Sequence, residues 1–276
     1  MFDEHLTNIL ANYHPAGLIA DRIFPLIRVP HAQGEEYACK MYKLIAYVTV
    51  EERANSDPVF MRAFEEGRVM RLQEELFLDW EIRAANLITS GSNLVSYAAI
   101  GSAWTDHNNS DPLNDIYGAV DNVKVATGYR PNRVLFSGAA WRNFRRHTAV
   151  IDKATMPVIS GGGHYPSVSQ VEELLEMTVL VGNAWYNEGA EGQALNLRQV
   201  WNDHVVVYYA PDQPSLESPS FGYCFRWSGA DIPNMQVERH PYDSRRHCSE
   251  VEIGYYQDER IVVPTLGCVL RNVTGQ

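Results

Sequence analysis

The chain has 276 residues, of which 45% are hydrophobic and 21% are charged, and its formal net charge is −11 at pH 7. This length and composition suit one large or two modest globular domains with a core that needs no cross-links. The acidic balance argues against sequence-specific recognition of nucleic acid, which normally requires a basic surface. The cysteines Cys39, Cys224, Cys248 and Cys268 form no Cys-x-x-Cys pair, so we interpret them as separate reduced thiols.

No targeting segment or membrane-spanning segment is predicted. The first 30 residues contain acidic side chains and lack the apolar core of a secretory signal peptide. No stretch approaches the run of roughly 18 apolar residues that a membrane-spanning helix needs. We therefore expect no contact with a membrane.

Residues 1–30 are predicted to form an N-terminal arm, because prolines at positions 25 and 30 interrupt regular structure. The arm is too apolar for a disordered tail, so it has to be buried against its own chain or against a neighbour. The prolines favour a neighbour, since such segments seldom build a core. The residues that we expect to make this contact are Leu18, Ile23 and Phe24.

Residues 31–55 are predicted to form a projecting loop. Two stretches, 35–43 and 44–51, are read as the two strands of a hairpin, because they alternate loosely and residues 47–50 are strongly β-prone.

Residues 56–89 are predicted to form one long helix. Ser56 or Asp57 can cap its first turn, and Pro58 stands where a missing N–H costs nothing. Apolar residues recur every three or four positions from Val69 to Leu87, and charged residues occupy the opposite face. At ~1.5 Å per residue this helix would span roughly 50 Å. Such a length is typical of a strut along which smaller elements lie, and an ordinary long core helix is the alternative.

A strand region over 94–104 and a polar loop over 105–112 precede a second helix, which is expected to end at Gly128. A buried strand over 134–137 leads into a helix over 138–147, in which Trp141 and Phe144 point inward. Further expected elements are a glycine-containing loop (155–166), a helix (168–176), strands (177–182, 198–210 and 221–227), a turn-rich insertion (184–192) and β structure after residue 236.

This order of elements predicts a mixed α+β fold. The late strands lack helices of their own, and the long helix is their natural partner. We therefore expect a discontinuous first domain, into which residues 111–235 are inserted.

No cofactor site and no catalytic residue is predicted. The run of Gly161, Gly162 and Gly163 lacks the Lys-Ser/Thr of a phosphate-binding loop, so it is interpreted as a surface loop. Ser137 stands at a strand-to-helix turn, as a hydrolase nucleophile would. Leu135 occupies the first glycine position of Gly-x-Ser-x-Gly, however, and a helix cap explains the serine equally well.

No metal site is predicted either. His240, Asp243, His247 and Cys248 include ligand types of Zn²⁺, but their spacing matches no established ligand set. The two arginines between them favour a cationic loop.

A second basic cluster, Arg142, Arg145 and Arg146, is interpreted as a solvated or subunit-facing helix end.

The middle of the chain contains a series of short motifs in a fixed order. They are Trp104-Thr105-Asp106, Ser110-Asp111-Pro112-Leu113-Asn114-Asp115-Ile116, Thr127-Gly128-Tyr129-Arg130-Pro131-Asn132, Val134-Leu135-Phe136-Ser137 and His147. This series resembles the major capsid proteins of tailed bacteriophages, in which a polar loop with Asp leads into a helix, a Thr-Gly-x-x-Pro-Asn turn and a strand, and the next helix ends near a histidine. Weaker likeness extends to the arm (13–25), to 180–187, to 199–210, to 221–223 and to the closing strand (267–273).

The resemblance implies a Hong Kong 97-like fold. Its parts would be an N-terminal arm (1–30), an extended loop (31–55), a peripheral domain with a long spine helix (56–110 and 236–276) and an axial domain (111–235). The loop is short for the family, we expect no scaffolding extension before residue 1, and no cross-linking Lys–Asn pair is identified.

The resemblance also implies a function: a structural, non-enzymatic subunit of the virion. It would assemble in the host cytoplasm, as pentamers and hexamers, into an icosahedral shell around double-stranded DNA without sequence-specific binding. The implied partners are other copies of the chain, a separate scaffolding protein, a portal and a decoration protein. Deleting residues 1–28 is expected to leave a folded subunit that cannot assemble.

Two other functions are compatible with the sequence. An encapsulin-like nanocompartment shell has the same fold and would enclose cargo protein instead of DNA. A soluble α/β hydrolase would use Ser137, and the missing elbow motif argues against it.

Overall fold

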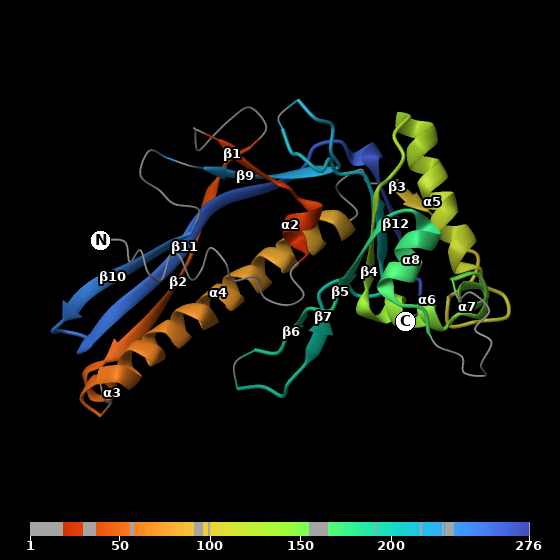
Figure 1. The fold of residues 1–276 in the computed structure, drawn as a ribbon. Helices are drawn as coiled ribbons and strands as arrows, with labels where there is room; N and C mark the ends of the chain where they lie inside the picture. Colours follow the sequence, from red (N-terminus) through yellow and green to blue (C-terminus); the bar gives the residue numbers. More distant parts are fainter. Residues whose placement is uncertain are drawn as a thin grey trace. The chain divides into compact units, whose positions relative to one another are not determined.

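The structure, a computed structural model, describes residues 19–29, 37–55, 58–90, 96–98, 100–154, 165–190, 192–215, 217–227, 229 and 235–275 (Figure 1). They belong to two units. The first unit is built from Leu26–Trp80 and Cys224–Arg260, and the second from Ile19–Pro25, Glu81–Tyr223 and Ile261–Gln276.

The spine helix α4 (Pro58–Thr89) is one continuous helix of 32 residues, as the sequence predicted. Val69, Leu76 and Trp80 lie on its buried face. On its exposed face the Arg71 Nε atom lies 3.1 Å from the Glu75 Oε1 atom. Because this pair is exposed, it adds only a few tenths of a kcal/mol, about 0.3, to helix stability. Burial of the apolar stripe is therefore what stabilises α4.

A five-stranded sheet forms the first unit. Its order is β1 (Leu26–Val29), β9 (Gly222–Trp227), β11 (Cys248–Ile261) and β10 (Gln236–Asp243), and β2 (Lys40–Thr49) also pairs with β11. The ladder between β2 and β11 is antiparallel and runs from Thr49 opposite Cys248 to Lys40 opposite Gln257.

The predicted hairpin over 35–43 and 44–51 is wrong. Lys40–Thr49 is a single strand whose partner is β11, and the short helix α3 (Val50–Ala54) follows it. The physical reason is that no Gly, Pro, Asn or Asp stands between Lys40 and Thr49 to form a turn. Residues 31–36 of the expected loop lie outside the described part of the chain.

The spine helix packs on this sheet within the first unit. The Tyr255 hydroxyl, on β11, donates to the Leu76 carbonyl at 3.2 Å. The Arg226 guanidinium lies 5.8 Å from the centre of the Trp80 ring and 5.3 Å from that of Tyr255. Its Nη2 atom donates to Gln257 Oε1 at 2.8 Å. A buried arginine is thus held between two aromatic rings, which is a favourable environment for a desolvated cation.

The second unit contains a five-stranded sheet in the order β3 (Ser96–Ala98), β12 (Gly267–Leu270), β8 (Val205–Tyr208), β4 (Arg133–Ser137) and β5 (Thr178–Gly182). β12 runs parallel to β3 and antiparallel to β8, while β4 runs parallel to β5. β12 therefore lies inside the sheet, with a partner on each side.

The predicted strand over 198–210 is two strands. β7 (Leu197–Gln199) ends before a turn at Trp201–Asp203, in which Asn202 has φ 48°, and β8 begins at Val205. Asn is among the few residues that adopt a left-handed conformation readily, so it breaks the strand. β7 pairs instead with β6 (Trp185–Asn187) in a two-stranded ribbon.

The helices that were predicted in the second unit begin and end within a residue of the predicted positions. The Asp111 side chain accepts from the Asn114 N–H at the start of α5 (Pro112–Thr127), and Gly128 ends this helix with φ 76°. The short helix α2 (Ala20–Ile23) and α7 (Thr148–Ala154) were not predicted. The other helices are α6 (Gly138–Arg146), α8 (Val168–Leu175) and the 3-10 helix η1 (Pro264–Leu266).

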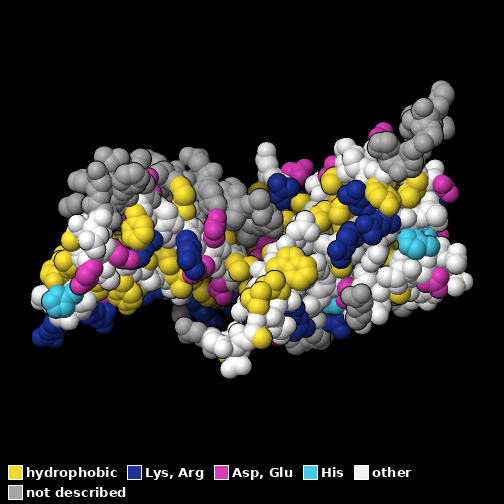
Figure 2. Space-filling model, turned by 90° about the horizontal axis from the view of Figure 1, so that it is seen from below, with side chains coloured by type: hydrophobic (Ala, Val, Ile, Leu, Met, Phe, Trp, Pro, Cys, Tyr) yellow, Lys and Arg dark blue, Asp and Glu magenta, His cyan; other side chains and the backbone are white. Residues whose placement is uncertain are grey.

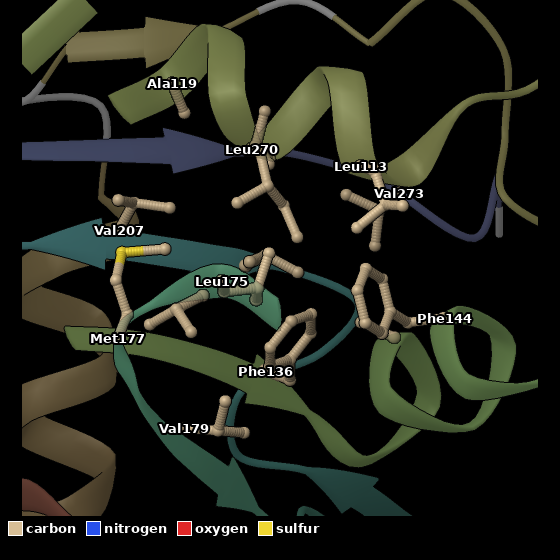
Figure 3. Packing of buried hydrophobic residues seen from close by; sticks show 14 of the residues in the cluster. Leu113, Ala119, Phe136, Phe144, Leu175, Met177, Val179, Val207, Leu270 and Val273 are labelled. Carbon is tan, nitrogen blue, oxygen red and sulfur yellow. The ribbon is translucent and has the colours of Figure 1, made fainter. Parts of the chain in front are cut away.

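Aromatic and aliphatic side chains from the sheet and its helices form the core of the second unit (Figure 3). Phe136 on β4 and Phe144 on α6 have ring centres 4.9 Å apart, and Leu113, Val207 and Leu270 belong to the same cluster. The inward direction of Trp141 and Phe144 is as predicted.

These units do not coincide with the predicted ranges 56–110 with 236–276 and 111–235. The division falls within the spine helix, between Trp80 and Glu81, and Ile261–Gln276 belongs to the second unit. The reason is that the closing strand β12 pairs with β8 and β3.

Candidate functional site

A buried carboxylate holds the described end of the N-terminal arm. Glu81, on the spine helix, accepts hydrogen bonds from the backbone N–H groups of Ile19 at 3.1 Å and Ala20 at 2.8 Å. Its other oxygen accepts from Trp201 Nε1 at 2.6 Å. Burial raises the pKa of Glu81 to about 7, and the three hydrogen bonds oppose that shift. One side chain thereby joins the arm, the spine helix and the turn before β8.

Two side chains of the sheet in the second unit bind the backbone of the next turn of the arm. The Arg133 Nη1 atom, on β4, donates to the Arg22 carbonyl at 2.6 Å, and the Tyr208 hydroxyl donates to the same oxygen at 3.4 Å. Burial raises the pKa of Tyr208, so this hydroxyl stays protonated and remains a donor.

The structure gives Ile23 and Phe24 a different place from the one that the sequence suggested. Both side chains are 0% exposed within their own chain, so they offer no surface to a neighbour here. Removing apolar side chains from water is favourable in any apolar environment, and the core of the same chain provides that environment for Ile23 and Phe24. Leu18, the third residue expected to contact a neighbour, lies outside the described residues.

This burial also corrects the expected result of deleting residues 1–28. The deletion would remove buried core residues and most of β1, which pairs with β9 from Leu26↔Cys224 to Val29↔Trp227. We now expect that deletion to prevent folding rather than assembly alone.

A row of arginines on α6 forms a basic surface of the second unit. Ser137 caps this helix by accepting from the Ala140 N–H at 3.2 Å, and the buried Trp141 and Phe144 fix its inward face. Arg142, Arg145 and Arg146 are spaced three and four residues apart, so they share the other face; we call these three the arginine row.

The arginine row makes no ion pair with a carboxylate in the part of the chain that the structure describes. Arg145 and Arg146 instead place their guanidinium groups 5.5 Å and 5.7 Å from the centre of the Tyr165 ring. Figure 2 looks at the side of the molecule on which α6 lies in Figure 1, and it shows Lys and Arg side chains gathered beside hydrophobic ones. The row is thus a group of cations at the surface whose described contact is an aromatic ring.

In the other basic cluster, at the turn between β10 and β11, carboxylates form ion pairs with an arginine. Arg246 lies 2.8 Å from Glu250 and 4.0 Å from Asp243. Tyr242 and His247 share a hydrogen bond of 3.1 Å. Over the described residues no group of three metal-ligating side chains is present here or elsewhere.

Ser137 has no role as a nucleophile in this structure. Its side chain is buried and its Oγ atom accepts the hydrogen bond that caps α6. A buried cap cannot reach a substrate, so the geometry gives the hydrolase alternative no support.

A serine and a histidine that the sequence analysis did not pair lie close together at the end of α6. Ser110 Oγ and His147 Nε2 are 3.1 Å apart, and His147 Nδ1 accepts from the Ala149 N–H at 3.3 Å. Nε2 therefore carries the proton, so His147 cannot take one from Ser110 as a catalytic base does. Burial, and the charge of His107 stacked on its ring at 5.1 Å, lower the pKa of His147. This pair is structural, and it fixes the turn between α6 and α7.

Comparison with known proteins gives one relative by sequence. No family profile matches the chain. The major capsid protein of Burkholderia phage BcepMu is 23% identical over 135 residues, which are 47% of this chain and 41% of that protein. The match therefore spans about two fifths of that relative's length.

Solved structures show the same fold over nearly the whole chain. A phage-related protein from Bordetella bronchiseptica RB50 superposes with a TM-score of 0.78 at 19% identity, covering 99% of this chain and 98% of that one. The putative capsid protein of a prophage of Escherichia coli CFT073 gives 0.57 at 13% identity, covering 98% and 99%. The SrpI encapsulin of Synechococcus elongatus PCC 7942 gives 0.53 at 13% identity, covering 99% and 96%.

The chain therefore has the predicted α+β, Hong Kong 97-like fold of phage capsid proteins. The proteins that it resembles are structural shell proteins and not enzymes, which agrees with the predicted function class. In the described part of the chain no helix is both long and apolar enough to cross a membrane.

Proposed function

We propose that this chain is the major capsid protein of a tailed phage. In this proposal copies of it form pentamers and hexamers, and these close into an icosahedral shell around double-stranded DNA. The observation that carries the proposal is the superposition over 99% of the chain on a phage-related protein, together with a sequence relative that is a phage major capsid protein. The net charge of −11 supports packaging without tight binding, because an acidic wall repels DNA phosphates.

The arginine row supplies one contact between subunits in this proposal. The three arginines have no carboxylate partner among the described residues, although the chain has 34 Asp and Glu residues against 23 Lys and Arg residues. An acidic surface of a neighbouring copy would neutralise them, and this complementarity would set the orientation of the two subunits. A separate scaffolding protein, a portal and a decoration protein complete the proposed set of partners, and the particle is a virion assembled in the host cytoplasm.

An encapsulin-like shell is the second candidate, because an encapsulin superposes over 99% of the chain. The two candidates differ in what the particle encloses. Nuclease-protected DNA inside would support the phage capsid, and a bound cargo protein would support the nanocompartment.

Sedimentation velocity on the purified chain, with electron microscopy of the fast fraction, tests the proposal. We expect closed shells tens of nanometres across, or rings of five and six subunits that close when the scaffold is supplied. A uniform dimer or tetramer that stays unchanged with concentration and with the scaffold would contradict it.

A further inference from the structure

Three polar side chains form a buried network between β9 and β11 in the first unit. Arg226 Nη2, on β9, donates to Gln257 Oε1 at 2.8 Å, and Gln257 Nε2 donates to Glu259 Oε1. Arg226 is 9% exposed, Gln257 is 0% exposed and Glu259 is 8% exposed. Gln257 and Glu259 are two residues apart on β11, so they lie on the same face of the sheet. One amide thus joins a buried cation to a buried anion; we call these three residues the buried network.

Stability alone does not explain the buried network. Removing a guanidinium group and a carboxylate from water costs free energy, and the hydrogen bonds and attraction between the charges recover that cost only in part. Apolar side chains of similar volume at such positions are often equally stable or more stable. The role of the network is therefore better sought in the alternative structures that it excludes.

The apolar pattern of β9 does not determine the register of this strand. Register is normally set by alternation, because a slip of one residue moves apolar side chains to the solvent face. In β9, however, residues 222–226 are all buried, so both faces of the strand are covered. Tyr223 and Phe225 point to one face and Cys224 to the other. A slip of one residue would again bury these apolar side chains on both faces.

Arg226 is the one charged residue in β9, and it makes the two registers unequal. In the observed register its guanidinium group binds Gln257 and lies between the rings of Trp80 and Tyr255. A slip of one residue would turn this side chain to the opposite face of the sheet, away from Gln257. A buried guanidinium group without its acceptor is strongly unfavourable, so the slipped strand is excluded.

We infer that the buried network fixes the register of β9 against β11 and adds little to the stability of the sheet. It makes one strand pairing unique, as a buried polar side chain fixes the register of some coiled coils at a cost in stability. This inference concerns the folding of a single chain, so it does not depend on the proposed shell function.

The triple variant Arg226→Met, Gln257→Leu, Glu259→Leu tests the inference. The control is Tyr255→Phe, which removes the neighbouring hydrogen bond to the Leu76 carbonyl and keeps the buried network. Each full-length chain is followed by thermal unfolding and by hydrogen exchange of peptides from β9 and β11, measured by mass spectrometry. Two registers would give two isotopic envelopes for the same peptide, because paired strands change register only by opening.

We expect one envelope for wild type and one for Tyr255→Phe, although Tyr255→Phe should unfold at a lower temperature. The triple variant should unfold close to the temperature of wild type, or above it, and give two envelopes. A folded triple variant with one envelope, or one that unfolds below Tyr255→Phe, overturns the inference.

A second variant, Arg226→Met with Glu259→Gln, decides the question if the triple variant does not fold. It removes both buried charges and keeps two amides that can bind each other. We expect it to fold and to give two envelopes. A single envelope, or a second failure to fold, would show that the network stabilises the sheet and would overturn the inference.

Discussion

Two regions of the second unit, the end of the N-terminal arm and the arginine row on α6, were both predicted to contact a neighbouring subunit. In the structure the first region is buried and the second lies at the surface. Ile23 and Phe24 are buried in their own chain, and Glu81 and Arg133 bind the backbone around them. The arginine row lies at the surface, with Tyr165 as its described contact.

The difference follows from what each kind of side chain needs. An apolar side chain gains free energy in any environment from which water is excluded. The core of its own chain is therefore as favourable as the surface of a neighbouring subunit. A guanidinium group needs an anion or water, and its own chain offers the row no carboxylate among the described residues. Changes to the two regions should therefore act on different properties, the first on folding and the second on assembly.

Phe24→Ala should have the largest effect, and it should act on folding. Truncating a fully buried phenylalanine leaves a cavity and costs about 3–5 kcal/mol. We expect the urea midpoint to fall accordingly. Val125→Ala, at an exposed position, is the control and should change the free energy of unfolding by less than about 0.5 kcal/mol. A Phe24→Ala chain as stable as wild type would show that this segment is not part of the core.

Glu81 should make the stability of the arm depend on pH. Its pKa is raised from 4.5 to about 7 by burial, so the folded chain holds this proton more tightly than the unfolded chain does. The resulting stabilisation is present in full below about pH 4.5 and is lost as the pH rises through about 7, with a total on the order of 3 kcal/mol.

Glu81→Gln removes that titration. Urea unfolding of both chains between pH 5 and pH 8 should give a difference in free energy that changes with pH, because only wild type loses stability across this range. A difference that stays constant over these pH values would contradict the assignment. The glutamine oxygen can still accept from the N–H groups of Ile19 and Ala20, whereas its NH2 group cannot accept from Trp201 Nε1. The variant is therefore expected to be less stable by an amount that does not change with pH.

Reversing the charge of the arginine row should leave folding unchanged and prevent assembly. The triple variant Arg142→Glu, Arg145→Glu, Arg146→Glu removes no buried group and no ion pair with a described residue. We expect an unchanged unfolding temperature and a loss of particles on electron micrographs, because like charges would now meet at the contact. Particles in normal yield would exclude the row as a subunit contact.

Arg246→Gln should have the smallest effect. This arginine is exposed and already paired with Glu250, and exposed ion pairs add little to stability. Both the unfolding temperature and the particle yield should stay as in wild type. Together with the triple variant it tests whether an unpaired arginine, rather than any arginine, matters for assembly.

Much of the fold could be predicted because its signals are local. The spine helix follows from an apolar stripe that continues for many turns, and α5 follows from Asp111 at one end and Gly128 at the other. The partner of β2 could not be predicted, since strand pairing joins residues such as Lys40 and Gln257 that are far apart in sequence.

The candidate site was predicted less well, for a related reason. The spacing of the arginines places them on one helix face, which the sequence shows. That Glu81 binds the arm depends on Ile19, Ala20 and Trp201, and these come together only in three dimensions. The sequence therefore identified which residues were charged or apolar, and not which of them would find a partner in the same chain.

The position of β12 inside the sheet of the second unit has a consequence for synthesis on the ribosome. Gly267–Leu270 lies between β3 and β8, and Phe221 lies against Gly267 where a side chain would otherwise stand. A nascent chain cannot complete this sheet until that strand has left the exit tunnel. A chain that ended before Gly267 would leave β8 paired only with β4, and β3 without its partner strand, so the subunit would stay unfinished. Under the proposed shell function, the fold would thereby keep truncated translation products out of a growing particle.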